Sequence, residues 1–410
     1  MRTGTGKYGL RYALKASYGK VAHCSLSVDG GTRAELDLPE GTAHFVEHSI
    51  FRGTQHKSAS RINSYLDRLG GELNAYTTKE EIVLHATVLK EDLRKAASLL
   101  LELACDATFP ENEIETERGV VLDEIISYKD SPSDDIYDNF EHRFFEGSSL
   151  DRFILGTSES VRSISREDME RFYRRCFQPG RMALSIVAPM SEEKMEELVL
   201  KLEECYFAHY EAADESPSVT DDRPLPHAFD LREDKDLHES NVVIGAPAVS
   251  IYDTQERLRT VLLANILGGP ASDSLLGRYI RERRGWVYGI ECSYNQYRDC
   301  GLVSISLGCD RENLERCLKA VQRITGRVCE NAMSERSLNA CKKQLFGQLA
   351  ISSDSGEAQC LSMGKSLLSF GKIWSDSLTR EMIEAITPEQ LRACAESIFR
   401  SERLARLIYV

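Results

Sequence analysis

The pentad His44-Phe45-Val46-Glu47-His48 decides how this chain is interpreted, and it lies in the segment GTAHFVEHSIFRGT of residues 41–54. On an α-helix, residues four apart lie on one face, one turn from each other. His44 and His48 can therefore point at one metal ion, with Glu47 beside them. The order H-x-x-E-H is the reverse of the commoner zinc motif H-E-x-x-H. The alternative is a helix with two incidental histidines, because short motifs also occur by chance.

A catalytic zinc ion needs a third protein ligand and one open position for water. The candidate is the segment ERGVVLDE of residues 117–124, which has the character of a helix. Glu117 and Glu124 are two helical turns apart on one face, so one carboxylate can bind the metal while the other supports a ligand. The alternative is a solvated acidic helix face, which is common in charged helices.

Length and composition exclude several classes of protein. A chain of 410 residues exceeds what one hydrophobic core supports, so two or more domains are expected. The net charge of −14 argues against nucleic-acid binding. No apolar run is long enough to span a membrane, and the N-terminus lacks the apolar core of a signal peptide. We therefore expect a cytoplasmic protein, in which twelve scattered cysteines without a C-x-x-C pair are free thiols.

A polar stretch rich in Pro, Ser and Asp predicts a linker at residues 208–228 between domains at 1–207 and 229–410. Each half alternates strands and helices: we expect strands at residues 21–28 and 72–77, a helix at 111–129 that Pro132 prevents from continuing, and a helix at 272–284. The segments 85–93 and 306–314 share one pattern, a strand end followed by an acidic helix start, which indicates a duplicated unit. We predict an α+β fold of two related domains, each a largely antiparallel sheet packed with helices.

These residues together resemble the pitrilysin/insulinase family of zinc peptidases, most closely its short members similar to mitochondrial processing peptidase. The segment of residues 41–54 resembles the family motif, and Glu124 follows His48 by 76 residues, the spacing of the family's third ligand. Further matching segments cover nearly the whole chain, at residues 70–80, 155–179, 267–269, 281–288 and 297–302. Ser49, Ile82 and Pro270 depart from the family pattern, but none of them removes a ligand or the base.

The resemblance implies a role for each candidate residue. A Zn²⁺ ion would be held by His44, His48 and Glu124, with Glu47 as the catalytic base and Glu117 supporting the ligands. For substrate binding, the residues implied are Asn74 and Ala75 on an edge strand and Phe45 in the motif. A catalytic role is implied for Arg281 and Tyr288 in the second half, which would help to hold the substrate and the developing oxyanion. Without the resemblance, a structural arginine and a core tyrosine are the better interpretation of the last two.

The resemblance also implies a dimeric clamshell that hydrolyses flexible or unfolded peptides. Family members build a chamber from four domains, and this chain supplies two, so we expect a homodimer or a heterodimer with a metal-free relative. No nucleic-acid or membrane partner is expected. Two alternatives stay open: a non-catalytic subunit of the same fold that binds peptides or assists assembly, and a zinc hydrolase acting on something other than peptides.

Overall fold

A computed structural model of the protein describes residues 1–208 and 224–410. The strands are β1 (Arg2–Thr5), β2 (Arg11–Ala16), β3 (Val21–Val28), β4 (Glu72–Thr77), β5 (Ile82–Leu89), β6 (Met182–Ala188), β7 (Asp230–Glu233), β8 (Glu239–Ala248), β9 (Gly289–Gln296), β10 (Gly301–Asp310) and β11 (Ala405–Tyr409). The α-helices are α1 (Thr42–Ser49), α2 (Ala59–Asp67), α3 (Leu93–Cys105), α4 (Glu111–Lys129), α5 (Pro132–Phe144), α6 (Ser158–Ser163), α7 (Arg166–Cys176), α8 (Glu192–Phe207), α9 (Thr254–Gly268), α10 (Leu314–Glu330), α11 (Glu335–Asp354), α12 (Gly356–Phe370), α13 (Asp376–Glu384) and α14 (Pro388–Ile398).

The strands form two sheets. The first has the order β1-β2-β6-β3-β5-β4, and the second has the order β7-β11-β8-β10-β9. All neighbouring strands are antiparallel except β2 with β6 and β7 with β11, which are parallel. The predicted α+β fold with two largely antiparallel sheets packed with helices is therefore confirmed.

Five strands follow one topology in both sheets. The orders β2-β6-β3-β5-β4 and β7-β11-β8-β10-β9 correspond strand by strand, and the parallel pair falls at the same place. In each case the fourth strand along the chain, β5 or β10, leads through a short 3₁₀ turn into a long helix, α3 or α10. This common topology supports the duplicated unit that the similar segments 85–93 and 306–314 indicate.

Packing divides the described chain into two units, neither of which is continuous in sequence. The first contains Met1–Ile126, the segment from Arg152 to the undescribed residues, and Ile351–Ile373. The second contains Ser127–Asp151, the segment from the undescribed residues to Ala350, and Trp374–Val410. Helix α5, from the first half of the sequence, thus belongs to the second unit, and α12, from the second half, belongs to the first unit. The predicted linker at 208–228 lies mostly outside the described residues.

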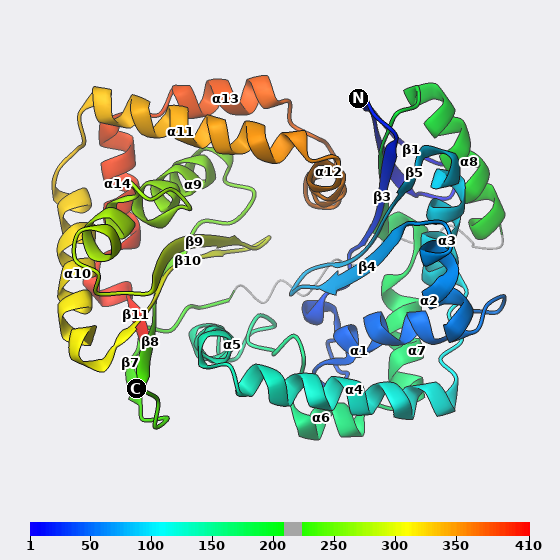
Figure 1. Ribbon diagram of the computed structural model, residues 1–410, viewed down its shortest axis with the longest axis horizontal. Coiled ribbons are helices and arrows are strands. Elements are labelled where there is room, and N and C mark those ends of the chain that lie inside the picture. The colour runs from blue at the N-terminus through cyan, green and yellow to red at the C-terminus, as the bar shows by residue number, and fades with distance from the viewer. Residues whose placement is uncertain (209–223) are drawn as a thin grey trace. The chain divides into compact units, whose positions relative to one another are not determined.

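Helices cover both faces of the first sheet. Figure 1 shows α3 and α8 on one side of it and α12 on the other. The central strand β6 is buried over its whole length, as its run of apolar and small residues, MALSIVA, predicts. On the face under α12, Ala13, Ala183 and Val187 of the sheet pack against Cys360, Met363 and Leu367 of the helix. Burial of this sheet on both faces therefore depends on a helix from the C-terminal part of the chain.

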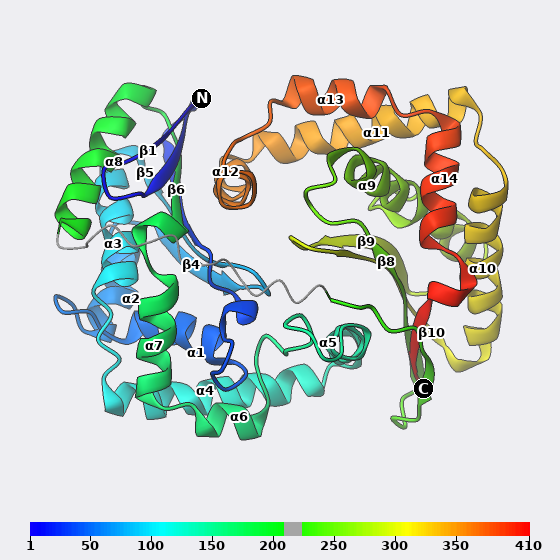
Figure 2. The ribbon, with the colours of Figure 1, turned by 180° about the vertical axis from the view of Figure 1, so that it is seen from behind.

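The second sheet is covered in the same manner. Figure 2 shows α5 on one side of it and α10 and α14 on the other. On the α5 side, Phe140 and Phe144 stack with their ring centroids 5.5 Å apart and pack against Val243 of β8 and Leu407 of β11. Helix α5 is therefore part of the core of the second unit.

Two further expectations concern thiols and membranes. All twelve cysteines are free. None of the helices in the described ranges combines the length and the low polarity that a membrane crossing requires.

Candidate metal centre

Helix α1 places two histidines and a glutamate together at the first sheet. It starts after Gly41, whose φ of 87° is left-handed, and it buries seven of its eight residues. The His44 and His48 rings lie edge to face with their centroids 4.5 Å apart, as the spacing of four residues predicts. The sequence therefore predicts the local geometry of this pair correctly.

Helix α4 brings Glu124 to the two histidines. Glu124 Oε2 lies 3.7 Å from His44 Nε2 and 3.6 Å from His48 Nε2. One ligand atom from each of the three residues lies within 4.8 Å of the others. Among the described residues, no other group of three or more His, Cys, Asp or Glu side chains is arranged in this way.

The three residues fit a zinc ion by distance and by chemistry. A tetrahedral zinc ion with bonds of about 2.1 Å separates its ligand atoms by about 3.4 Å, close to the observed distances of the glutamate oxygen. Burial and the neighbouring His48 lower the pKa of His44 to about 3. A neutral imidazole is the form that binds metal, so His44 is ready to bind without first losing a proton.

Glu117 orients His48 from the same helix α4. It is buried, and its Oε1 lies 2.8 Å from His48 Nδ1, while its Oε2 forms an ion pair with Arg52. With Nδ1 bound to Glu117, Nε2 of His48 is left to face Glu124. Burial lowers the pKa of His48, but Glu117, Glu47 and Glu124 outweigh this effect and raise it above its usual value. His44 Nδ1, in contrast, is buried without a hydrogen-bond partner in the described chain.

Glu47 lies beside the cluster and is held by a residue that the sequence did not single out. Its side chain is 8% exposed, and Thr77 Oγ1 of β4 donates a hydrogen bond to Glu47 Oε2 at 3.3 Å. Burial raises the pKa of Glu47 to about 7, and His48 and Thr77 oppose this rise. A carboxylate with such a pKa can accept and release a proton near neutral pH.

Strand β4 is an edge strand of the first sheet, paired with β5 on one side only. Leu73, Ala75 and Thr77 are half-buried, whereas Asn74 and Tyr76 are exposed on the other face. Side chains two apart on a strand lie on the same face, so Thr77 shares the half-buried face of Ala75. This alternation is the signal in the sequence that could have identified Thr77 as a residue facing the candidate site.

Phe45 differs from its predicted role as a substrate contact. Its side chain is fully buried, and the Arg118 guanidinium lies over its ring at 5.2 Å from the centroid. Its neighbours in sequence, His44 and Val46, are buried as well. Phe45 therefore packs in the core of the first unit and has no exposed surface to offer a peptide.

Arg281 and Tyr288 belong to the second unit and line one cavity of about 660 Å³. Arg281 lies in a π-helical segment, Gly277–Glu282, and donates from Nε to Glu282 Oε1 at 3.0 Å. Tyr288 is 63% exposed and donates from its hydroxyl to Asp310 Oδ1 at 2.5 Å, which raises the pKa of the phenol. Both side chains are thus accessible to a ligand rather than part of the core.

Comparison with known proteins gives two family matches along the chain. Residues 11–158 match the family described as insulinase (peptidase family M16), and residues 163–345 match the peptidase M16 inactive domain. The first match contains the His44, His48 and Glu124 cluster, and the second contains Arg281 and Tyr288.

Related sequences and structures extend over the whole chain. An uncharacterized zinc protease of Bacillus subtilis, YmxG, is 28% identical over 392 residues, which is 95% of this chain and 93% of that protein. An uncharacterized zinc protease of Streptomyces coelicolor is 29% identical over 387 residues, 93% of this chain and 82% of that protein. The crystal structure of a protease from Helicobacter pylori superposes with a TM-score of 0.90 at 17% identity, covering 100% of this chain and 98% of that one.

Proposed function

Because the chain belongs to the insulinase, or M16, family of peptidases, we propose that it is a zinc metalloendopeptidase that hydrolyses flexible or unfolded peptides. The observation that carries the proposal is the cluster of His44, His48 and Glu124, with ligand atoms within 4.8 Å of one another and Glu47 beside them. The names of relatives that share about 28% of their residues with this chain agree with it.

The chemistry divides between a bound metal ion and Glu47. A zinc ion in this cluster would polarise the scissile carbonyl and lower the pKa of water. Thr77 holds Glu47 Oε2, while Glu47 Oε1 accepts no hydrogen bond within the described chain. Oε1 is therefore the atom that takes a proton from the attacking water and passes it to the leaving amine. Burial raises the pKa of Glu47 to about 7, and a bound cation would lower it, which keeps the carboxylate in the form that accepts a proton at neutral pH.

Strand β4 would bind the substrate by strand addition. Its outer edge has no strand partner in the described chain, so the backbone at Asn74 and Ala75 can pair with an extended peptide. Such pairing recognises an extended backbone more than particular side chains, which restricts substrates to chains that are flexible or unfolded. Thr77 links this strand directly to Glu47, so a peptide on β4 would lie beside the base.

Arg281 and Tyr288 would bind the substrate and the developing oxyanion. The two residues share a cavity and are exposed, as that role requires. We further propose that the protein is a homodimer in which these residues serve the metal centre of the partner subunit. Family resemblance supports this arrangement, since four domains form a chamber and one chain supplies two.

A peptide-library digest with and without a chelator tests the function, together with elemental analysis of the purified protein. We expect one zinc per chain, cleavage at many sites in unfolded peptides, and loss of cleavage on chelation that zinc restores. Protein that takes up no metal after exposure to zinc would contradict the proposal. Stoichiometric zinc without cleavage of any peptide would instead favour a hydrolase of another substrate.

A further inference from the structure

The start of α1 has no cap of its own. The N-cap residue is Gly41, which has no side chain to accept the free N–H groups at the start of the helix. A carboxylate from an earlier turn takes this place, because Ala43 N donates to Glu35 Oε1 at 2.9 Å. Ala43 directly precedes His44, so Glu35 binds the backbone next to a proposed metal ligand.

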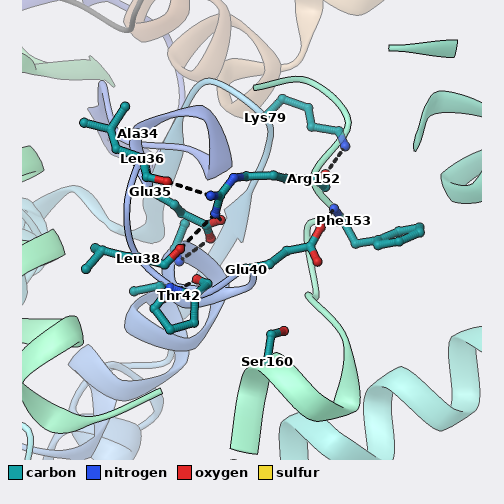
Figure 3. A network of polar contacts seen from close by, with 12 residues as sticks. Ala34, Glu35, Leu36, Leu38, Glu40, Thr42, Lys79, Arg152, Phe153 and Ser160 are labelled. Carbon is teal, nitrogen blue, oxygen red and sulfur yellow. Dashed lines mark hydrogen bonds and ion pairs between the residues drawn. The ribbon is translucent and has the colours of Figure 1, made fainter. Parts of the chain in front are cut away.

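Arg152 holds Glu35 and the loop that leads into α1. Its Nη1 donates to Glu35 Oε2 at 3.0 Å and to Leu38 O at 3.0 Å, and its Nη2 donates to Leu36 O at 2.6 Å. Leu36 has a φ of 54°, a left-handed conformation that is unfavourable for a residue with a side chain. The Arg152 guanidinium therefore stabilises the strained loop at residues 36–38 by donating hydrogen bonds to the carbonyls of Leu36 and Leu38. Figure 3 shows these contacts converging on Arg152.

The backbone after Arg152 packs directly on the same loop. Phe153 N donates to Glu40 Oε1 at 2.5 Å. A Cβ added at Gly41 would lie 2.7 Å from Leu155 O, and one at Gly156 would lie 2.5 Å from Glu40 O. The two chain segments therefore approach as closely as glycine permits. Residues 152–156 therefore fix the loop that leads into α1, the helix that carries His44 and His48.

A carboxylate buried as deeply as Glu35 lowers the stability of the fold unless its hydrogen bonds compensate, and its partner Arg152 is only partly buried. Glu35 is 0% exposed, and burial raises its pKa to about 8, although Ala43 N and Arg152 oppose the rise. Apolar residues of similar size often stabilise a fold as well as a buried ion pair does. What apolar residues cannot do is accept the Ala43 N–H and hold two loop carbonyls at defined positions.

We propose that Glu35 and Arg152 are positioning residues that fix the N-terminus of α1 and thereby the place of His44 in the metal centre. This role rests on the proposed function, since it concerns the geometry of the metal site. Neither side chain touches the cluster, so the pair acts through the backbone of Ala43 and the loop at residues 36–38.

The test compares Glu35→Gln with a matched control, Glu203→Gln. Glutamine keeps the size of the side chain, but its amide nitrogen cannot accept a hydrogen bond. Glu203 is also buried, at 1% exposure, and its Oε1 accepts backbone N–H groups of Tyr8 and Leu10 at 2.9 and 3.3 Å, but it belongs to α8 and not to the metal centre. Both variants replace a buried carboxylate with an amide of the same size, so the control separates that exchange itself from the position of Glu35 beside α1.

The readouts are the affinity for Zn²⁺, the visible absorption spectrum of the Co²⁺-loaded protein, and the separate values of kcat and KM. For Glu35→Gln we expect metal affinity or kcat to fall by about 10–100-fold, with an altered Co²⁺ spectrum and an unchanged KM, because residues that orient metal ligands have effects of this size. Glu203→Gln should leave all three at the parent values.

A Glu35→Gln protein with parent metal affinity, spectrum and kcat would overturn the positioning role while the proposed function stands. If that variant does not fold, Arg152→Lys provides the same test, since lysine keeps the charge but cannot hold Glu35 and both carbonyls in one geometry. A parent protein that binds no Zn²⁺ would instead refute the proposed function, and the positioning role with it.

Discussion

The two sheets share one strand order, yet the element that follows their second common strand differs completely. After β3 in the first unit, the chain forms the short helix α1, which carries His44, Glu47 and His48. After β8 in the second unit, it forms the longer helix α9, whose buried residues are apolar or small apart from one threonine. The same scaffold thus carries the candidate metal centre in one unit and a packed core beside an accessible cavity in the other.

The difference teaches that topology does not decide where the chemistry lies. The backbone order is the same in both units, but only the first has side chains on α1 and α4 that can converge on a metal ion within the described chain. The second unit keeps Arg281 and Tyr288 in its cavity.

Loss of a metal ligand should have the largest effect. His44→Ala, His48→Ala or Glu124→Ala leaves two ligands where a catalytic zinc needs three, so zinc occupancy and peptide cleavage should both fall to background. Elemental analysis measures the zinc occupancy, and a peptide assay measures the cleavage. The control is His142→Ala, a histidine on α5 in the second unit, which should keep full zinc occupancy. Retention of stoichiometric zinc by any of the three ligand variants would contradict the assignment.

Replacing the base should separate binding from chemistry. Glu47→Gln keeps the size of the side chain but cannot take a proton, so kcat should fall by roughly 10²–10⁴-fold. Zinc content and peptide affinity should stay at parent values, because Glu47 is not one of the three ligands. Hydrolysis at the parent rate by this variant would show that Glu47 is not the base.

Mixing two inactive variants should test whether the two units cooperate between subunits. Glu47→Gln damages the first unit and Tyr288→Phe the second. If each site combines groups from both subunits, a mixed dimer has one site with both defects and one with neither. After full exchange of equal amounts, half the dimers are mixed, and activity should recover to about a quarter of the parent value. An absence of recovery after verified exchange would exclude the arrangement across subunits and leave the zinc assignment intact.

Removing the Thr77 hydroxyl should have the smallest effect. The hydrogen bond from Thr77 lowers the pKa of Glu47, so Thr77→Val should raise that pKa. The base acts when deprotonated, and the acidic limb of the kcat/KM profile should therefore move to higher pH, by less than about one unit for one neutral hydrogen bond. Thr87→Val is the control, because its hydroxyl contacts His23 instead. A shift to lower pH, or an equal shift in the control, would contradict the role of Thr77.

Local patterns in the sequence predict much of the fold. The strands expected at residues 21–28 and 72–77 match β3 and β4, and Pro132 follows the end of α4 as predicted. The helix expected at residues 272–284 is instead a π-helical segment, Gly277–Glu282. Periodicity shows that a segment is helical but not which sheet it covers, so the exchange of α5 and α12 between the two units could not be predicted.

In the candidate site, too, the sequence predicts relations between neighbouring residues but not contacts between residues far apart in the chain. The helical spacing of His44 and His48 predicts their common face without further knowledge. The convergence of Glu124 depended on the family resemblance, because no local rule brings α4 to α1. Arg152 contacts Glu35 over 117 positions of sequence, and a polar contact at that distance leaves no periodic signal. Such partners become visible only once the chain is folded.

The helix α12 has a consequence for the order in which the protein can be made. The last strand of the first sheet, β6, ends at Ala188, but α12 begins only at Gly356. At about 5–20 residues per second, a ribosome needs roughly 10–30 seconds to synthesise the intervening chain. During this time the face lined by Ala13, Ala183 and Val187 has no cover from its own helix. The nascent first unit would therefore present an unfinished apolar surface to chaperones until the C-terminal part of the chain emerges.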